Sequence, residues 1–307
     1  MNGRLGRWRR RAQWASTVAL PVVVASNVWF LTDGWGDTPP VEHDRIESTS
    51  EPAHPPPPAA PLLDVAAELG TAEQTPRIPL PAGAPARVAF LGDSVAWSTA
   101  SAVSSFAGHY GIEVVNAGIW GCGTVRGTPF RYFGSTYESL PNDCDHWPAQ
   151  WQRAIDFAQP HVAVVMVGRW ELMDRVHRGR WTHVGDPSFD AYLGRELDLA
   201  ITIAGSRGAR VVVATTPYYR RGDGPGGGTW PEDEPHRVDE VNALLRAAAA
   251  RNRVGIVDYG ALLSPGGALA MDIDGFRVRS DGVHIAVGSG PWMAPRLLPA
   301  IRTAAGI

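Results

Sequence analysis

The chain of 307 residues contains no lysine, so all 28 of its basic residues are arginine. The loop Gly224–Gly228 is rich in glycine, but it lacks the lysine and the strand–helix context of a phosphate-binding loop. The net charge is −3, and five arginines lie within residues 1–13, which leaves no basic surplus in the remainder. This distribution argues against a nucleic-acid-binding protein.

Motifs for metals are also missing. Histidines outside one C-terminal motif show no spacing typical of metal ligands, and we expect neither a metal nor a cofactor. These histidines include His109, His161, His183 and His236.

An uncharged, apolar segment covers residues 14–32 and follows the basic tail 1–13. At a rise of about 1.5 Å per residue, a helix of this length just crosses the bilayer core. The arginines predict that the N-terminus stays in the cytoplasm and that the rest of the chain is exported. We expect an uncleaved signal anchor and a single-pass protein of the cell membrane, with a signal peptide cleaved near Ala25 as the alternative.

The chain has only two cysteines, Cys122 and Cys144. In an exported domain, such a pair favours a disulfide over a metal or redox site. Two unpaired buried thiols are the alternative.

Residues 33–86 are rich in proline, alanine, glutamate and threonine, and include the run Pro55–Pro58. This composition is typical of a semi-rigid, extended spacer. We therefore expect a linker that holds a globular domain, residues 87–307, away from the membrane.

Strand and helix patterns alternate through residues 87–307. The apolar runs predict strands at Val88–Leu91, Glu113–Asn116, Val162–Val167, Arg210–Thr215 and Gly255–Asp258. The patterns between and after them predict helices at Ala96–Ala107, Ala149–Ala158, Asp190–Arg207, Val238–Arg251 and beyond Ala286. This order predicts an α/β fold with an open parallel sheet, which binds ligands at the carboxyl ends of its strands.

Two distant motifs together indicate acyl transfer. Ser94 ends the tripeptide Gly92-Asp93-Ser94 directly after the first predicted strand, and Asp281-Gly282-Val283-His284 lies near the C-terminus. Histidine can accept the serine proton, and a carboxylate can hold the imidazole in one tautomer. We therefore predict Ser94 as the nucleophile, His284 as the base and Asp281 as its orienting acid. An α/β-hydrolase nucleophile elbow is excluded, because that fold needs several strands before its serine.

Such a reaction also needs donors for the oxyanion. The backbone N–H groups of Ser94 and Gly118 are candidates, and Gly118 as an ordinary loop glycine is the alternative.

These residues carry a resemblance to a known family. Gly92-Asp93-Ser94, the glycine block around Gly118 and Asp281-x-x-His284 resemble the motifs of SGNH (GDSL-type) hydrolases. The chain is most similar to SGNH domains fused to membrane acyltransferases that O-acetylate bacterial surface glycans. The features shared with these domains are Cys122 in a glycine-rich loop, Cys144 before Trp147, and Gly168-Arg169-Trp170 after the third strand. The resemblance implies a flavodoxin-like three-layer α/β/α domain.

One motif departs from the family. The third block is usually Gly-x-Asn-Asp, whose asparagine donates to the oxyanion, but here it reads Gly168-Arg169-Trp170-Glu171. Arg169 is a candidate replacement donor, because its guanidinium is a strong hydrogen-bond donor to an anion. A structural salt bridge between Arg169 and Glu171, or another acid, is the alternative.

Twelve tryptophans are present, and some lie near loops at the predicted active edge. They could stack on sugar rings, or they could pack in the core. The five concerned are Trp120, Trp147, Trp151, Trp170 and Trp181.

The sequence thus predicts a membrane-tethered, extracytoplasmic serine esterase or O-acyltransferase, acting on acyl groups, acetyl above all, of cell-envelope glycans. Its expected partners are an acylated glycan or another small ester and, by the resemblance, a membrane acyltransferase. A non-catalytic envelope-binding or scaffolding module that retains the fold is the alternative.

Overall fold

The computed structural model describes residues 76–80 and 82–307. The predicted tail 1–13, the signal anchor 14–32 and most of the linker 33–86 lie outside the described residues. Among the helices that are described, none combines the length and the apolar character needed to cross a membrane. The end of the linker contacts the domain, because the Ile78 N–H donates to the Gly208 carbonyl at 3.1 Å.

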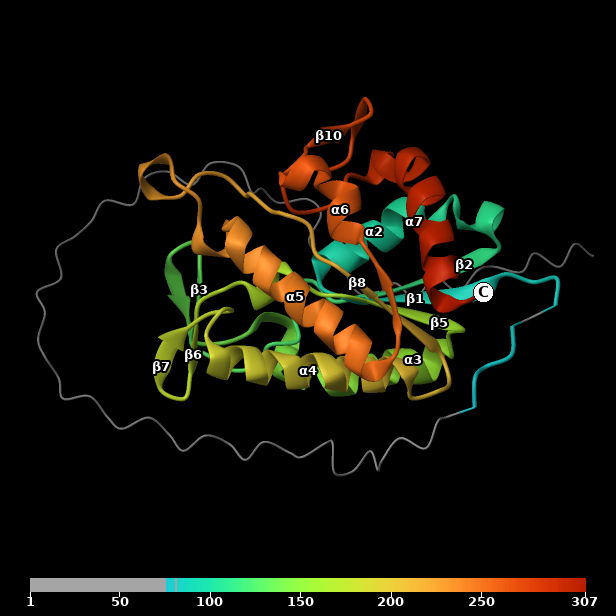
Figure 1. The fold of residues 1–307 in the computed structure, drawn as a ribbon, viewed down its shortest axis with the longest axis horizontal. Coiled ribbons are helices and arrows are strands. Elements are labelled where there is room, and N and C mark those ends of the chain that lie inside the picture. Colours follow the sequence, from blue (N-terminus) through green and yellow to red (C-terminus); the bar gives the residue numbers. More distant parts are fainter. Residues whose placement is uncertain (1–75, 81) are drawn as a thin grey trace, which may run out of the picture. The chain divides into compact units, whose positions relative to one another are not determined.

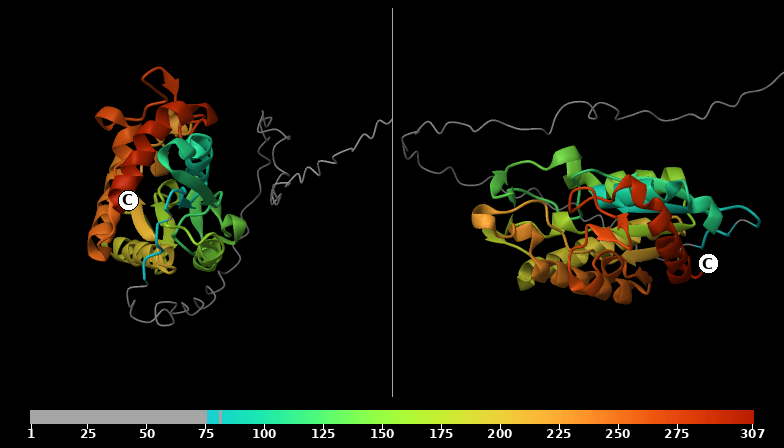
Figure 2. Two further views of the ribbon diagram at one scale, coloured as in Figure 1. Left: turned by 90° about the vertical axis from the view of Figure 1, so that its right-hand side faces the viewer. Right: turned by 90° about the horizontal axis from the view of Figure 1, so that it is seen from above.

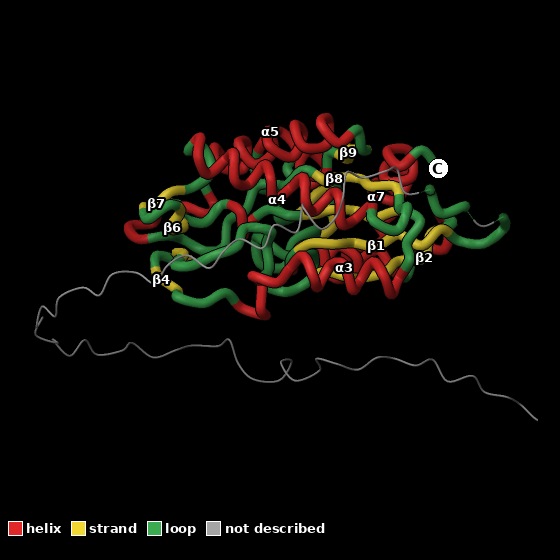
Figure 3. The backbone as a smooth tube through the Cα atoms, turned by 90° about the horizontal axis from the view of Figure 1, so that it is seen from below, coloured by secondary structure: helices red, strands yellow, loops and turns green. Residues whose placement is uncertain are grey.

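A five-stranded parallel sheet forms the centre of the domain (Figure 3). Its order is β2-β1-β5-β8-β9, and every neighbouring pair is parallel. The strands are β1 (Ala86–Gly92), β2 (Ile112–Gly118), β5 (Val162–Met166), β8 (Arg210–Ala214) and β9 (Gly255–Val257). All five predicted strands are confirmed.

Helices cover both faces of this sheet (Figures 1 and 2). Helices α2 and α7 pack on one face, and α3, α4 and α5 pack on the other. Their bounds are α2 (Ser94–Ser104), α3 (Trp147–Ala158), α4 (Pro187–Gly205), α5 (Pro235–Asn252) and α7 (Gly290–Ala305), with a short α6 (Tyr259–Leu263) after β9. The result is the three-layer α/β/α architecture that the family resemblance implies, built on the parallel sheet that the alternating pattern predicts.

The core lies on both sides of the sheet because the central strands are apolar throughout. Every residue of β5 is buried, and so are all residues of β1 except Arg87. Removing such strands from water supplies the main driving force for folding of a parallel sheet.

A second, antiparallel sheet was not predicted. It has the order β4-β3-β6-β7 and is built from an insertion after β2 and another after β5 (Figure 1). Its strands are β3 (Phe130–Tyr132), β4 (Ser135–Tyr137), β6 (Arg175–His177) and β7 (Arg180–Thr182), and a separate hairpin joins β10 (Asp272–Ile273) to β11 (Phe276–Arg277). Strands of two or three residues are too short to show an alternating pattern in the sequence.

The register of the large sheet brings several loops to one edge. Gly92 at the end of β1 pairs with Gly118 at the end of β2 and with Met166 at the end of β5. The segments that follow these three strands therefore start side by side, at the carboxyl edge where such sheets bind ligands.

Candidate active site

Ser94 lies in a tight turn from β1 into α2. Gly92 has a φ of +151°, and a Cβ there would overlap the Met166 carbonyl oxygen, so the turn requires glycine. Asp93 caps α2, because its Oδ1 accepts a hydrogen bond from the Val95 N–H at 2.7 Å. Ser94 is thus the first residue of the helix, where backbone N–H groups have no partner within the helix.

The structure brings Ser94, His284 and Asp281 into one hydrogen-bonded chain. The Ser94 Oγ lies 2.9 Å from His284 Nε2, and His284 Nδ1 lies 2.8 Å from Asp281 Oδ2. The other carboxylate oxygen of Asp281 accepts from the N–H groups of Val283 and His284, at 3.0 and 2.8 Å. With the ring proton on Nδ1, Nε2 is free to accept the serine proton.

The loop that carries His284 is fixed from two sides. Gly282 has a φ of +82°, and a Cβ there would overlap the Arg220 carbonyl oxygen. On the other side, the Ile285 N–H donates to the Ser98 hydroxyl of α2 at 3.1 Å. These contacts hold the imidazole against the N-terminus of α2.

Asp281 is held ionised. Burial opposes ionisation, but the hydrogen bonds from the His284 ring and from the His284 and Val283 amides outweigh it and lower the pKa of the carboxyl. The Arg221 Nε, 3.7 Å from Asp281 Oδ2, adds a positive charge beside it. An ionised Asp281 is what the histidine needs in order to become an imidazolium during proton transfer.

Two other carboxyl groups are buried at the same edge. Burial, and then the charge of Glu171, raise the pKa of Asp93 to about 7. Burial also raises the pKa of Glu171, although this carboxylate accepts hydrogen bonds from the Thr124 amide at 2.6 Å and the Gly168 amide at 2.8 Å. Glu171 therefore ties the loop after β2 to the loop after β5.

The candidate oxyanion donors differ in their surroundings. The Gly118 N–H donates to Asn116 Oδ1 at 3.3 Å, so this amide already has an acceptor. The Gly121 amide, three residues further on, is a candidate donor that was not predicted. Among the described residues it has no acceptor, and the neighbouring Trp120 contacts His284. The pattern in the sequence that could have indicated the Gly121 amide is the glycine spacing Gly121-x-Gly123.

Arg169 is buried and paired with an acid other than Glu171. Its side chain is 4% exposed, its Nε donates to Asp233 Oδ1 at 2.8 Å, and its Nη2 lies 3.7 Å from Glu232 Oε1. Burial alone would lower the pKa of Arg169, but the hydrogen bond to Asp233 raises it. The guanidinium also lies over the Tyr132 ring. Arg169 therefore connects the loop after β5 to the segment before α5.

The disulfide between Cys122 and Cys144 is confirmed. It joins the loop after β2 to the segment that leads into α3. In the same place, the Asn142 side-chain amide donates to the Trp120 carbonyl oxygen. The loop with Trp120 and Gly121 is thus attached at two adjacent points.

The five tryptophans fall into different environments. Trp147 and Trp151 are buried and pack against each other in the core, so sugar stacking is excluded for both. Trp170 is half-buried and packs on Tyr132. Trp120 and Trp181 are exposed.

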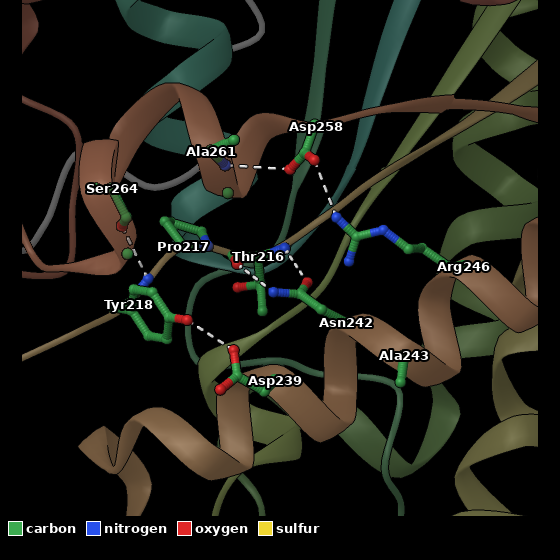
Figure 4. Close-up of a pocket in the computed structure, with 13 residues that line it drawn as sticks. Thr216, Pro217, Tyr218, Asp239, Asn242, Ala243, Arg246, Asp258, Ala261 and Ser264 are labelled. Carbon is green, nitrogen blue, oxygen red and sulfur yellow. Dashed lines mark hydrogen bonds and ion pairs between the residues drawn. The ribbon is translucent and has the colours of Figure 1, made fainter.

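A cavity of about 530 Å³ lies elsewhere, between α5, α6 and the segment after β8 (Figure 4). Ionic and polar pairs line it, including Arg246 with Asp258 and Tyr218 with Asp239. Neither Ser94, His284 nor Asp281 lines this cavity. Within residues 76–80 and 82–307, no group of three or more histidine, cysteine or acidic side chains is arranged to hold a metal ion.

Comparisons with solved structures return proteins of low identity. A GDSL-like lipase from Bacteroides thetaiotaomicron is 16% identical, with a TM-score of 0.49, over 78% of this chain and 96% of its own. The M. smegmatis aryl esterase is 14% identical, with a TM-score of 0.48, over 71% and 99%. A carbohydrate acetylesterase from Sinorhizobium meliloti is 16% identical, with a TM-score of 0.46, over 71% and 99%.

A search of curated proteins returns no match. A family model described as "SGNH domain (fused to AT3 domains)" matches residues 65–286, which is more than half of the chain. This match includes both the serine turn and the Asp281–His284 segment. The chain therefore belongs to the SGNH domain family.

Proposed function

We propose that the chain is a serine esterase or O-acyltransferase that acts through an acyl-enzyme intermediate on Ser94. The hydrogen-bonded chain from Ser94 through His284 to Asp281 carries this proposal. A serine at a helix N-terminus, within 2.9 Å of an oriented imidazole, meets the geometric requirement for an activated nucleophile.

In the proposed reaction, the Ser94 Oγ attacks the ester carbonyl while His284 Nε2 takes its proton. Asp281 stabilises the imidazolium, which then protonates the leaving alcohol. Water, or a hydroxyl of an acceptor sugar, attacks the acyl-enzyme with His284 again as base. The choice between water and sugar decides between hydrolysis and transfer.

The developing oxyanion needs backbone donors at the N-terminus of α2. The Ser94 amide has this position. We infer that the Gly121 amide joins it, because within the described residues it donates to no acceptor, whereas the Gly118 amide donates to Asn116 Oδ1. In this proposal Arg169 is paired with Asp233 and holds the loop after β5 in place.

We propose acetyl esters as the substrates, with cell-envelope glycans as their carriers, because the matching family is one of SGNH domains fused to AT3 domains. The association of this family with AT3 domains supports a membrane acyltransferase as acyl donor.

We also propose that the segment 14–32 anchors the chain in the cell membrane, with its catalytic domain outside the cytoplasm. The uncharged segment, the preceding arginines and the disulfide support this location.

The test is hydrolysis of nitrophenyl acetate by the purified full-length protein, with and without an oligosaccharide acceptor. Wild-type protein should release nitrophenol, and Ser94→Ala should reduce the rate by about 10³-fold or more. Acetylated oligosaccharide among the products identifies a transferase, and free acetate alone identifies a hydrolase. A wild-type rate equal to that of Ser94→Ala would favour the non-catalytic module instead.

A further inference from the structure

Two tryptophans flank the proposed catalytic histidine. The Trp120 ring centroid lies 4.9 Å from that of His284, with 31° between the planes. Trp97 of α2 lies 5.4 Å from Trp120, at 60°. Because His284 Nε2 is 2.9 Å from the Ser94 Oγ, any ester that reaches the serine comes close to the Trp120 indole.

Both rings are open to solvent. Trp120 is 48% exposed and Trp97 is 39% exposed, although each could bury a large apolar area. Core packing therefore does not account for their outer faces. Trp181 has a similar exposure of 38%, but its ring is covered by the Arg131 guanidinium at 3.9 Å.

The backbone around both rings is held in place. Cys122, two residues after Trp120, is bonded to Cys144, and the Asn142 side chain donates to the Trp120 carbonyl. The Trp97 carbonyl accepts from the Asn116 side chain at 2.9 Å. A surface that is ordered before binding loses little conformational entropy when a ligand arrives.

We propose that Trp120, supported by Trp97, is a platform for the sugar ring that carries the ester, an inference that rests on the proposed function. One face of a pyranose presents C–H groups, which match the negative face of an indole and remove its apolar area from water. An open, flat surface suits such a ring, whereas an alkyl chain gains most from an enclosed channel. Trp120 thereby determines the alcohol side of the ester rather than the acyl side.

The first experiment compares two acetyl esters with the full-length protein in detergent. One is a mono-O-acetylated methyl glucopyranoside, and the other is glycerol triacetate, which has no ring. Trp120→Leu should reduce kcat/KM for the pyranoside relative to the triacetate by about tenfold, and Trp120→Phe should restore part of this ratio. The matched control is Trp181→Leu, which should leave the ratio unchanged.

Three results would overturn the platform. Equal loss on both esters would mean that Trp120 only positions His284. An unchanged ratio in Trp120→Leu would mean that the ring does not contact the sugar. A loss that grows with acyl length in ring-free esters would assign the surface to the acyl chain.

A binding experiment separates this inference from the proposed function. Saturation-transfer NMR of the same acetylated pyranoside with Ser94→Ala needs no turnover. Binding should persist in Ser94→Ala with Trp181→Leu and should weaken about tenfold in Ser94→Ala with Trp120→Leu. If the wild type proves to have no esterase activity, this pattern still supports the platform, whereas equal binding by both double variants would refute it.

Discussion

Ser94 combines three local features that a serine in an ordinary turn lacks. It follows a strand whose final glycine is required by contact with Met166, it starts α2, and its hydroxyl faces His284. The positive end of the helix dipole favours the negative charge that develops at this point during acyl transfer. The sheet register and the C-terminal loop thus place Ser94 of the motif Gly92-Asp93-Ser94 opposite His284.

Asp281→Asn tests the orienting carboxylate. The amide can keep the loop hydrogen bonds, but its NH₂ group can face His284 Nδ1 and favour the wrong tautomer. We expect kcat for acetyl ester hydrolysis to fall by about 10³–10⁴-fold. Thermal unfolding should serve as the control for folding, and an activity within tenfold of wild type would contradict the triad.

Asp93 gives stability a distinct pH dependence. Its pKa of about 7 in the folded protein lies above the ordinary value of 3.8, so the folded state holds this proton more tightly. The resulting stabilisation is complete below about pH 4 and is lost as the pH rises through about 7. Asp93→Asn keeps the helix cap without titrating.

The pH dependence due to Asp93 can be checked by measuring the melting temperatures of the wild type and of Asp93→Asn from about pH 4 to above pH 7. We expect the wild type to lose stability relative to the variant between about pH 4 and 7, with a constant difference at higher pH. Parallel curves for the two proteins would show that Asp93 is ionised throughout.

At the scale of elements, the parallel strands of five to seven residues, β1, β2, β5 and β8, and the large helices could be predicted because each is a run with one pattern. The small sheet could not, because β3 and β6 pair across more than 40 intervening residues and each has three. The candidate site likewise has residues that could be predicted from the sequence and contacts that could not. Ser94, Asp281 and His284 stand in recognisable motifs, whereas the pairing of Arg169 with Asp233 and the hydrogen bond of Gly118 to Asn116 depend on loop conformations.

The loop after β2 carries both Trp120 and Gly121, so the proposed sugar platform and oxyanion donor depend on the rigidity of this loop. Replacing Cys122 and Cys144 by alanine should lower the free energy of unfolding by about 3 kcal/mol, since the closed loop spans 22 residues. Urea titration checks this value. An unchanged free energy of unfolding would contradict the predicted contribution of the disulfide. We also expect kcat/KM for acetyl esters to fall under conditions where the variant remains folded.

For the whole molecule, the proposed arrangement is a catalytic domain on a spacer outside the membrane. Protease added to intact protoplasts of the producing cells should digest the domain, while a cytoplasmic marker protein stays intact. Immunoblotting against the C-terminus provides the measurement, and lysed cells show that the protease can cleave it. Full protection in intact protoplasts would place the domain in the cytoplasm and refute the proposed topology.

The central claim is that Ser94 is an activated nucleophile, and covalent labelling tests it most directly. The full-length protein in detergent is treated with a fluorophosphonate probe, digested and analysed by mass spectrometry. The account predicts a single phosphonyl adduct on the peptide that contains Ser94, absent from Ser94→Ala and formed more slowly in Asp281→Asn. No adduct on the folded wild type, or an adduct on another residue, would contradict it.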